Sequence, residues 1–121
     1  MFSHPTRRIF IAVTAMLGAT LLLASFPNLA AAKKVPAGFA KHYVEVNGVR
    51  LHYLIGGKGS PVVLLHGYAE TGHMWRPLMQ PLAKHHTVIV PDLRGAGGSS
   101  KPESGYDKKN MAADIHELTT S

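Results

Sequence analysis

The chain has 121 residues, of which 45% are hydrophobic, and a formal net charge of +6 at pH 7. It contains no cysteine, so disulfide bonds, thiolate metal sites and a cysteine nucleophile are excluded together. The 13 lysines and arginines are scattered along the chain and form no stripe interleaved with aromatic residues, which leaves nucleic-acid binding unsupported.

The first 32 residues have the pattern of a signal peptide. Arg7 and Arg8 precede an almost unbroken apolar run over 9–24, and the small residues that end at Ala32 fit the A-x-A cleavage rule. The run has 16 residues, fewer than the roughly 20 that span a bilayer. We therefore expect cleavage after Ala32, export to the periplasm or the medium, and no stable membrane span afterwards. An uncleaved anchor is the alternative, and the paired arginines leave twin-arginine export open beside the general route.

After this segment we predict a linker over 33–39 and a partial α/β domain over 40–121. Alternating, β-branched and aromatic residues over 43–46 and 49–55 indicate two strands. The Asn-Gly pair between them accepts positive φ at both turn positions, so an antiparallel hairpin is predicted.

The second half of the chain alternates strands with helices. The apolar run 62–65 is typical of a strand buried on both faces, as parallel strands are. Apolar residues spaced three and four apart predict a helix over 74–84, which Pro81 is expected to kink or divide. A second parallel strand over 87–90 and a helix over 108–119, capped by an aspartate, follow. This order argues for the α/β fold class.

The first of the parallel strands leads directly into His66, Gly67 and Tyr68. Ligands bind outside the carboxyl ends of strands in α/β sheets, so this loop is a candidate site. Gly67 allows the main chain to approach a substrate closely, which places the amide N–H of Tyr68 to donate to a developing oxyanion. The alternative is that His66 and Gly67 only turn the chain after a strand.

These segments resemble the N-terminal part of the α/β-hydrolase fold family, closest to its epoxide-hydrolase and dehalogenase-like branch. The first shared pattern is His-Gly-aromatic-Pro-Glu followed by a Trp-Arg pair, in which Ala69 stands in place of the proline. The second is D-x-R-G-x-G-x-S-x-x-P over 92–102. The resemblance implies a backbone oxyanion donor at Tyr68 and the strand order 1-2-4-3. Ala69 leaves the subfamily open, with esterases, peroxidase-like and lactone-cleaving members as alternatives.

The resemblance also implies that the loop after Asp92 is structural. We accordingly expect Asp92 and Arg94 to make charge-assisted hydrogen bonds that tie a turn, and not to react with substrate. The glycines of this loop do not form a dinucleotide fingerprint, because the third glycine would fall on Ser100. The histidines show no metal-ligand spacing with carboxylates. No cofactor and no metal are predicted.

No nucleophile motif is present in these 121 residues. Neither Ser60 nor Ser99 has the flanking glycines of G-x-S-x-G, and no aspartate occupies the matching frame. In the resembling family the nucleophile follows the next strand, so the choice between serine and aspartate stays open. We predict an exported, cofactor-free hydrolase of a small ester, epoxide or organohalide, inactive as this chain alone. A non-catalytic, ligand-binding member of the fold and a truncated remnant are the alternatives, and the oligomeric state is not specified.

The expected truncation has a structural consequence. Without a fifth strand, the strand over 62–65 would be an open edge of the sheet, and open apolar edges invite pairing with another chain. We therefore expect the isolated chain to aggregate or to fold loosely.

Overall fold

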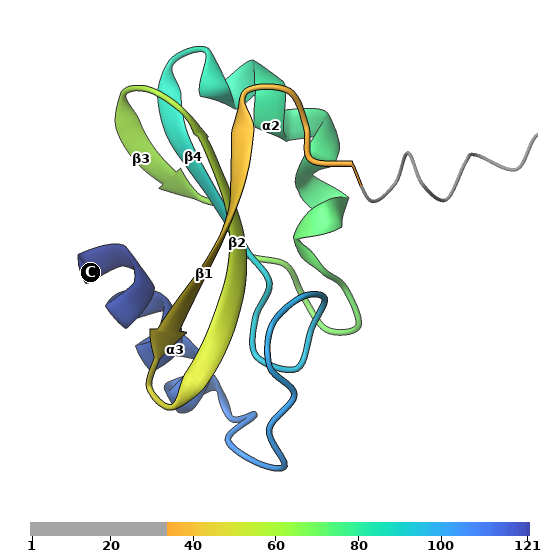
Figure 1. Cartoon of the computed structure of the whole chain (residues 1–121), viewed down its shortest axis with the longest axis vertical. Helices are drawn as coiled ribbons and strands as arrows, with labels where there is room; N and C mark the ends of the chain where they lie inside the picture. Colours follow the sequence, from red (N-terminus) through yellow and green to blue (C-terminus); the bar gives the residue numbers. More distant parts are fainter. Residues whose placement is uncertain (1–33) are drawn as a thin grey trace, which may run out of the picture.

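The computed structural model describes residues 34–121, so the predicted signal peptide lies outside the described residues (Figure 1). Four strands, one 3-10 turn and two α-helices follow one another in this part of the chain. In order they are β1 (Phe39–Val46), β2 (Val49–Gly57), β3 (Ser60–Val63), η1 (Gly72–Trp75), α2 (Arg76–Ala83), β4 (His86–Pro91) and α3 (Lys108–Thr120). Within 34–121, no helix has both the length and the apolar character that crossing a membrane requires.

The strands form one mixed sheet in the order β1-β2-β4-β3, which confirms the predicted order. The β1–β2 and β2–β4 pairs are antiparallel, and β3 runs parallel to β4. Asn47 (φ 47°) and Gly48 (φ 75°) form the predicted tight turn between β1 and β2. The α/β fold class is therefore confirmed.

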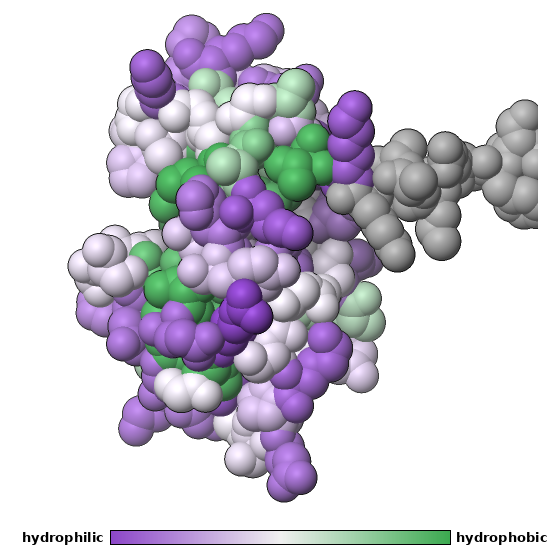
Figure 2. All heavy atoms as spheres, viewed as in Figure 1, coloured by the Kyte–Doolittle hydropathy of each residue, from purple (hydrophilic) through white to green (hydrophobic). Residues whose placement is uncertain are grey.

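Two separate apolar clusters lie on the two faces of the sheet. Val88 and Val90 of β4 point to the same face because side chains alternate along a strand, and they pack there against Met79 of α2. The second cluster lies on the other face of the β1–β2 hairpin, near α3, which contacts β1; its buried members are Val46, Val49 and Leu51. Apolar side chains reach the surface beside α2 and again between α3 and the hairpin, with hydrophilic residues between the two patches (Figure 2).

The prolines divide the predicted helix over 74–84 one turn earlier than expected. Residues Gly72–Trp75 form η1, and α2 begins at Arg76 with Pro77 in its first turn, where a missing N–H costs nothing. Pro81 lies inside α2, and the helix continues past it to Ala83 at the cost of one backbone hydrogen bond.

Strand β3 is less buried than its apolar sequence predicts. Val62 and Val63 are half-buried, and Leu65 beyond the strand is 45% exposed. The expectation of burial on both faces is wrong here because no described helix packs extensively on β3, and β4 covers only one of its edges. The position of β3 at the edge is as predicted.

The lead-in before β1 lies along α2. The Arg76 guanidinium donates to the carbonyl oxygen of Lys34 at 2.5 Å, and Gln80 Nε2 donates to that of Ala37 at 3.5 Å. Strand β1 begins at Phe39, which the sequence assigns to the linker. Part of the predicted linker is thus attached to the domain.

Candidate functional site

A cleft of about 980 Å³ lies between the loop after β3 and the loop after β4. Residues 66–71 line one side and residues 93–97 the other, and Tyr106, Lys108 and Met111 complete the lining. The structure thus brings together the two glycine-containing motifs that the sequence singles out, at the carboxyl ends of two neighbouring parallel strands.

His66 connects the two loops. Its Nδ1 lies 2.9 Å from the carbonyl oxygen of Gly67, and its Nε2 lies 2.9 Å from the amide nitrogen of Leu93. A carbonyl only accepts and an amide only donates, so the proton is on Nδ1 and the ring is neutral. The side chain is 7% exposed and both ring nitrogens are occupied. His66 therefore fixes the relative position of the loops and has no free nitrogen for proton transfer.

Tyr68 is at the mouth of the cleft. Its side chain is fully exposed, and its amide N–H takes part in no backbone hydrogen bond within 34–121. A weak turn bond of 3.4 Å, from the Glu70 amide to the Gly67 carbonyl, closes this loop. The Tyr68 amide N–H therefore has no backbone acceptor among the described residues.

At position 69, where the pattern of the resembling family has proline, this chain has alanine with a positive φ. Its φ is 60°, in the left-handed region that costs a residue with a Cβ roughly 1–2 kcal/mol. Proline is locked near φ −65° and is incompatible with this turn. Gly67, in contrast, has no positive φ, and a Cβ there would meet open space. The backbone conformation does not itself require glycine at 67.

Asp92 is the centre of the loop after β4. Its Oδ2 accepts from His52 Nδ1 at 2.8 Å and from the Gly98 amide at 2.9 Å, and its Oδ1 accepts from the Gly72 amide at 2.7 Å. Burial by itself would raise the pKa of Asp92, but these hydrogen bonds outweigh it and hold the pKa below the usual 3.8. Gly97 has φ 48°, and a Cβ on it would lie 2.1 Å from the Asp92 carboxylate.

The predicted structural role of Asp92 and Arg94 is confirmed. Arg94 Nε and Nη2 donate to the two carboxylate oxygens of Asp114 at 2.6 and 2.7 Å, with both residues buried. This bidentate pair raises the pKa of Arg94. Asn47 in the hairpin turn also donates to Asp114, at 3.1 Å. The pair joins the loop after β4 to α3 and to the β1–β2 turn.

The partners His52 and Asp114 in these networks are not among the residues predicted from the sequence. His52 is one polar residue in an alternating strand, and nothing in that pattern distinguishes it. Asp114 does give a signal, because it lies three residues after Met111 and four before Leu118, on the apolar face of α3. A charge on the buried face of a helix predicts a buried partner.

Comparison with known proteins agrees with this architecture. Residues 60–120 match the model of the alpha/beta hydrolase fold family. The chain is 48% identical over 79 residues to the soluble epoxide hydrolase of Corynebacterium sp. strain C12, covering 65% of this chain and 28% of that protein. It is 42% identical over 86 residues to the fluoroacetate dehalogenase of Burkholderia sp., covering 67% and 28%.

A solved structure of the epoxide hydrolase CorEH without ligand has 46% sequence identity and a TM-score of 0.66, covering 68% of this chain and 29% of that one. The chain thus spans somewhat over a quarter of the length of the relatives that it matches. With the family match, the sheet order and the cleft in agreement, the chain belongs to the α/β-hydrolase fold family.

Proposed function

We propose that this chain forms the N-terminal part of an exported, cofactor-free hydrolase that acts on a small ester, epoxide or organohalide. The observation that supports this best is the cleft, which is lined by Tyr68 on one side and on the other by a loop that His66 and Asp92 hold through hydrogen bonds. The epoxide hydrolase and fluoroacetate dehalogenase relatives favour a small organic substrate.

In this proposal Tyr68 supplies one oxyanion donor from its backbone. One such donor contributes on the order of 10²- to 10³-fold in rate, because it stabilises charge only as that charge develops. His66 holds the donor loop against the loop after β4, and Gly67 leaves the cleft open at its mouth. The nucleophile must come from a group outside residues 1–121, since no G-x-S-x-G or matching aspartate frame is present in them.

Kinetic assay of the 121-residue chain tests the chemical part of the proposal. We expect no turnover above buffer of p-nitrophenyl acetate, styrene oxide or fluoroacetate. The coding sequence that follows Ser121 gives the complementary test: an in-frame G-x-[SD]-x-G supports a hydrolase, whereas a degraded motif supports a non-catalytic binding protein. A rate that a single substitution within 1–121 abolishes would contradict the proposal.

The export part is tested separately by expression with the complete N-terminus. We propose cleavage after Ala32, so mass spectrometry of the exported protein should find Lys33 at the new N-terminus. Replacing Arg7 and Arg8 by lysine distinguishes the routes, since only twin-arginine export requires the arginines. Intact Met1 in the soluble exported fraction would contradict cleavage.

A further inference from the structure

A second, smaller cavity lies beside the main cleft. It has a volume of about 150 Å³ and shares only Thr71 with the lining of the cleft. Its walls come from β2, from the start of η1 and α2, and from the end of β4. The lining residues other than Thr71 are His52, Leu54, Gly72, His73, Arg76 and Asp92.

His52 enters this cavity in a fixed orientation. The bond from its Nδ1 to Asp92 leaves Nε2 as the one ring nitrogen without a partner among residues 34–121. A neutral ring with its proton on Nδ1 offers only a lone pair at Nε2, whereas a protonated ring offers an N–H there. Asp92 already accepts from His52, Gly72 and Gly98, so its negative charge is satisfied inside the network.

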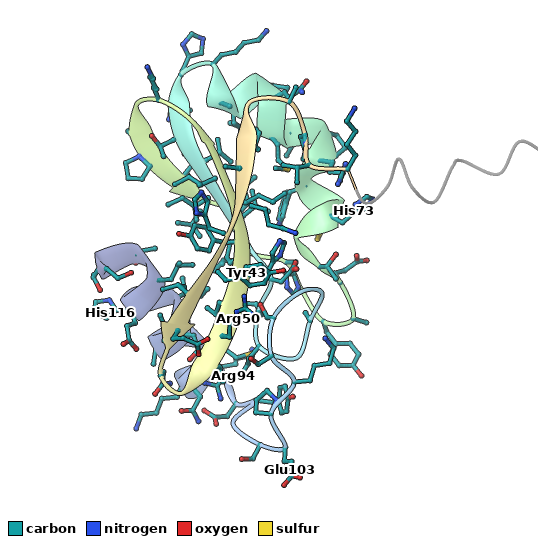
Figure 3. The ribbon with its side chains drawn as sticks, in the orientation of Figure 1. Tyr43, Arg50, His73, Arg94, Glu103 and His116 are labelled. Atoms are coloured by element: carbon teal, nitrogen blue, oxygen red, sulfur yellow. The ribbon has the colours of Figure 1, made fainter. Side chains whose placement is uncertain are left out.

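Arg76 contributes a permanent positive charge to the same cavity. One of its N–H groups donates to the Lys34 carbonyl, while its Nε is buried and has no hydrogen-bond partner within 34–121. Nε has no accessible surface, so an anion in the cavity would take its hydrogen bonds from the terminal nitrogens of the guanidinium, which is charged at every ordinary pH. His73 of η1, which is exposed, adds a second imidazole to the lining (Figure 3).

We propose that this cavity binds a small oxyanion, a carboxylate or a sulfate-like group, between the Arg76 guanidinium and the protonated His52 imidazole. The volume admits such a group with a few waters and excludes a drug-sized molecule, whose pockets are about 300–1,000 Å³. Arg76 disfavours a metal cation, and the one carboxylate in the lining is already bonded. This inference does not depend on the proposed function, since neither the Tyr68 amide nor a nucleophile takes part.

Binding is expected to take up a proton. The anion needs an N–H at Nε2, so it stabilises protonated His52. The titratable or charged groups around this ring are Asp92 from the end of β4, Tyr43 from β1 at 5.3 Å between ring centroids, and His73 and Arg76 from η1 and α2. Affinity should therefore be higher at pH 6 than at pH 8 for an anion that does not itself titrate, such as sulfate.

Titration of the 121-residue chain with sodium sulfate at constant ionic strength tests the proposal. Calorimetry and the NMR signals of the His52 ring measure binding. We expect saturable binding that shifts these signals and is tighter at pH 6. Arg76→Gln should weaken it by about tenfold or more, because it removes a charge-assisted hydrogen bond. Arg50→Gln, an equal change of charge at an exposed site, should leave affinity within about twofold.

Two controls keep the outcome decisive. His52→Gln should abolish the pH dependence of binding. If that variant does not fold, Arg76→Lys serves instead, and it should still weaken binding because lysine keeps the charge but lacks the planar set of N–H donors of arginine. Sulfate stabilises proteins generally, so thermal shifts count only as the difference between the parent and Arg76→Gln. Unchanged His52 signals at 50 mM sulfate, or equal losses in Arg50→Gln and Arg76→Gln, would overturn the proposal.

Discussion

The loop after β4 is held by buried charged groups, whereas the loop after β3 is held by one imidazole and a weak turn. Asp92, Ser99 and Arg94 bond the first loop to β2, η1 and α3. The loop after β3 is held by His66 and by one turn bond of 3.4 Å, and it contains Ala69 at positive φ. The difference indicates that the loop after β4 is the better supported of the two, while the loop that carries Tyr68 is held by fewer and weaker bonds.

The largest expected change in the free energy of unfolding is at the buried Arg94–Asp114 ion pair of the loop after β4. Asp114→Ala leaves Arg94 buried without a partner, which typically costs ~3–5 kcal/mol. Urea unfolding followed by circular dichroism measures the loss. Glu103→Ala, at an exposed site, is the control and should change the free energy of unfolding by less than about 0.5 kcal/mol. Equal stability of the two variants would show that the loop does not depend on this pair.

Asp92→Asn is expected to cost ~2 kcal/mol near pH 7, since hydrogen bonds to a charged group each contribute ~1.5–3 kcal/mol and the amide retains part of them. The effect should depend on pH. The pKa of Asp92 is lowered in the folded chain, so its stabilisation is complete above about pH 4 and is lost as pH falls through the lower, folded value. The parent and the variant should therefore converge in stability in acid.

The same contrast explains what the sequence could and could not predict. The strand order, the Asn47-Gly48 turn and the α3 helix with its Asp107 cap follow from local patterns and the family resemblance, and the structure confirms them. The role of Asp92 and Arg94 as ties was also predictable. Their partners His52 and Asp114 were not identified, because they lie 40 and 20 residues away and are selected by tertiary proximity.

The loop after β3 was predictable as a location and not as a conformation. A glycine after an apolar strand marks it, but the positive φ falls on Ala69, a residue that local preference does not place there. The departure from proline at 69 was visible in the sequence. Its physical meaning, a turn that proline cannot adopt, needed the backbone angles.

Ala69→Gly should therefore stabilise the chain by about 1 kcal/mol, because glycine adopts positive φ without the steric cost. Ala69→Pro should destabilise it, since the fixed proline φ disrupts the turn. Thermal unfolding measures both changes. Ala113→Gly, in the interior of α3, is the matched control and should lower stability by roughly 0.5–1 kcal/mol. A loss of stability in Ala69→Gly would show that the turn is not strained.

The smallest effect on stability is expected at the open edge beside this loop. Leu64 donates its N–H to the Ile89 carbonyl at 2.9 Å. Because the backbone groups of successive residues in a strand point to opposite sides, those of Val63 and Pro61 point away from β4. Proline has no N–H, and the outer edge of β3 therefore offers only the Val63 donor. This edge can therefore form fewer hydrogen bonds with a strand of another chain than its apolar sequence predicts.

Leu65→Lys tests whether association still begins there. Leu65 is 45% exposed, so lysine should change the free energy of unfolding by less than about 0.5 kcal/mol while its charge raises the monomer fraction in size-exclusion chromatography. Leu64→Lys is the contrasting variant, because the half-buried Leu64 packs against the Met79 cluster and a charge there should destabilise the chain more than lysine at 65 does. If Leu65→Lys leaves the monomer fraction unchanged, association does not begin at this edge.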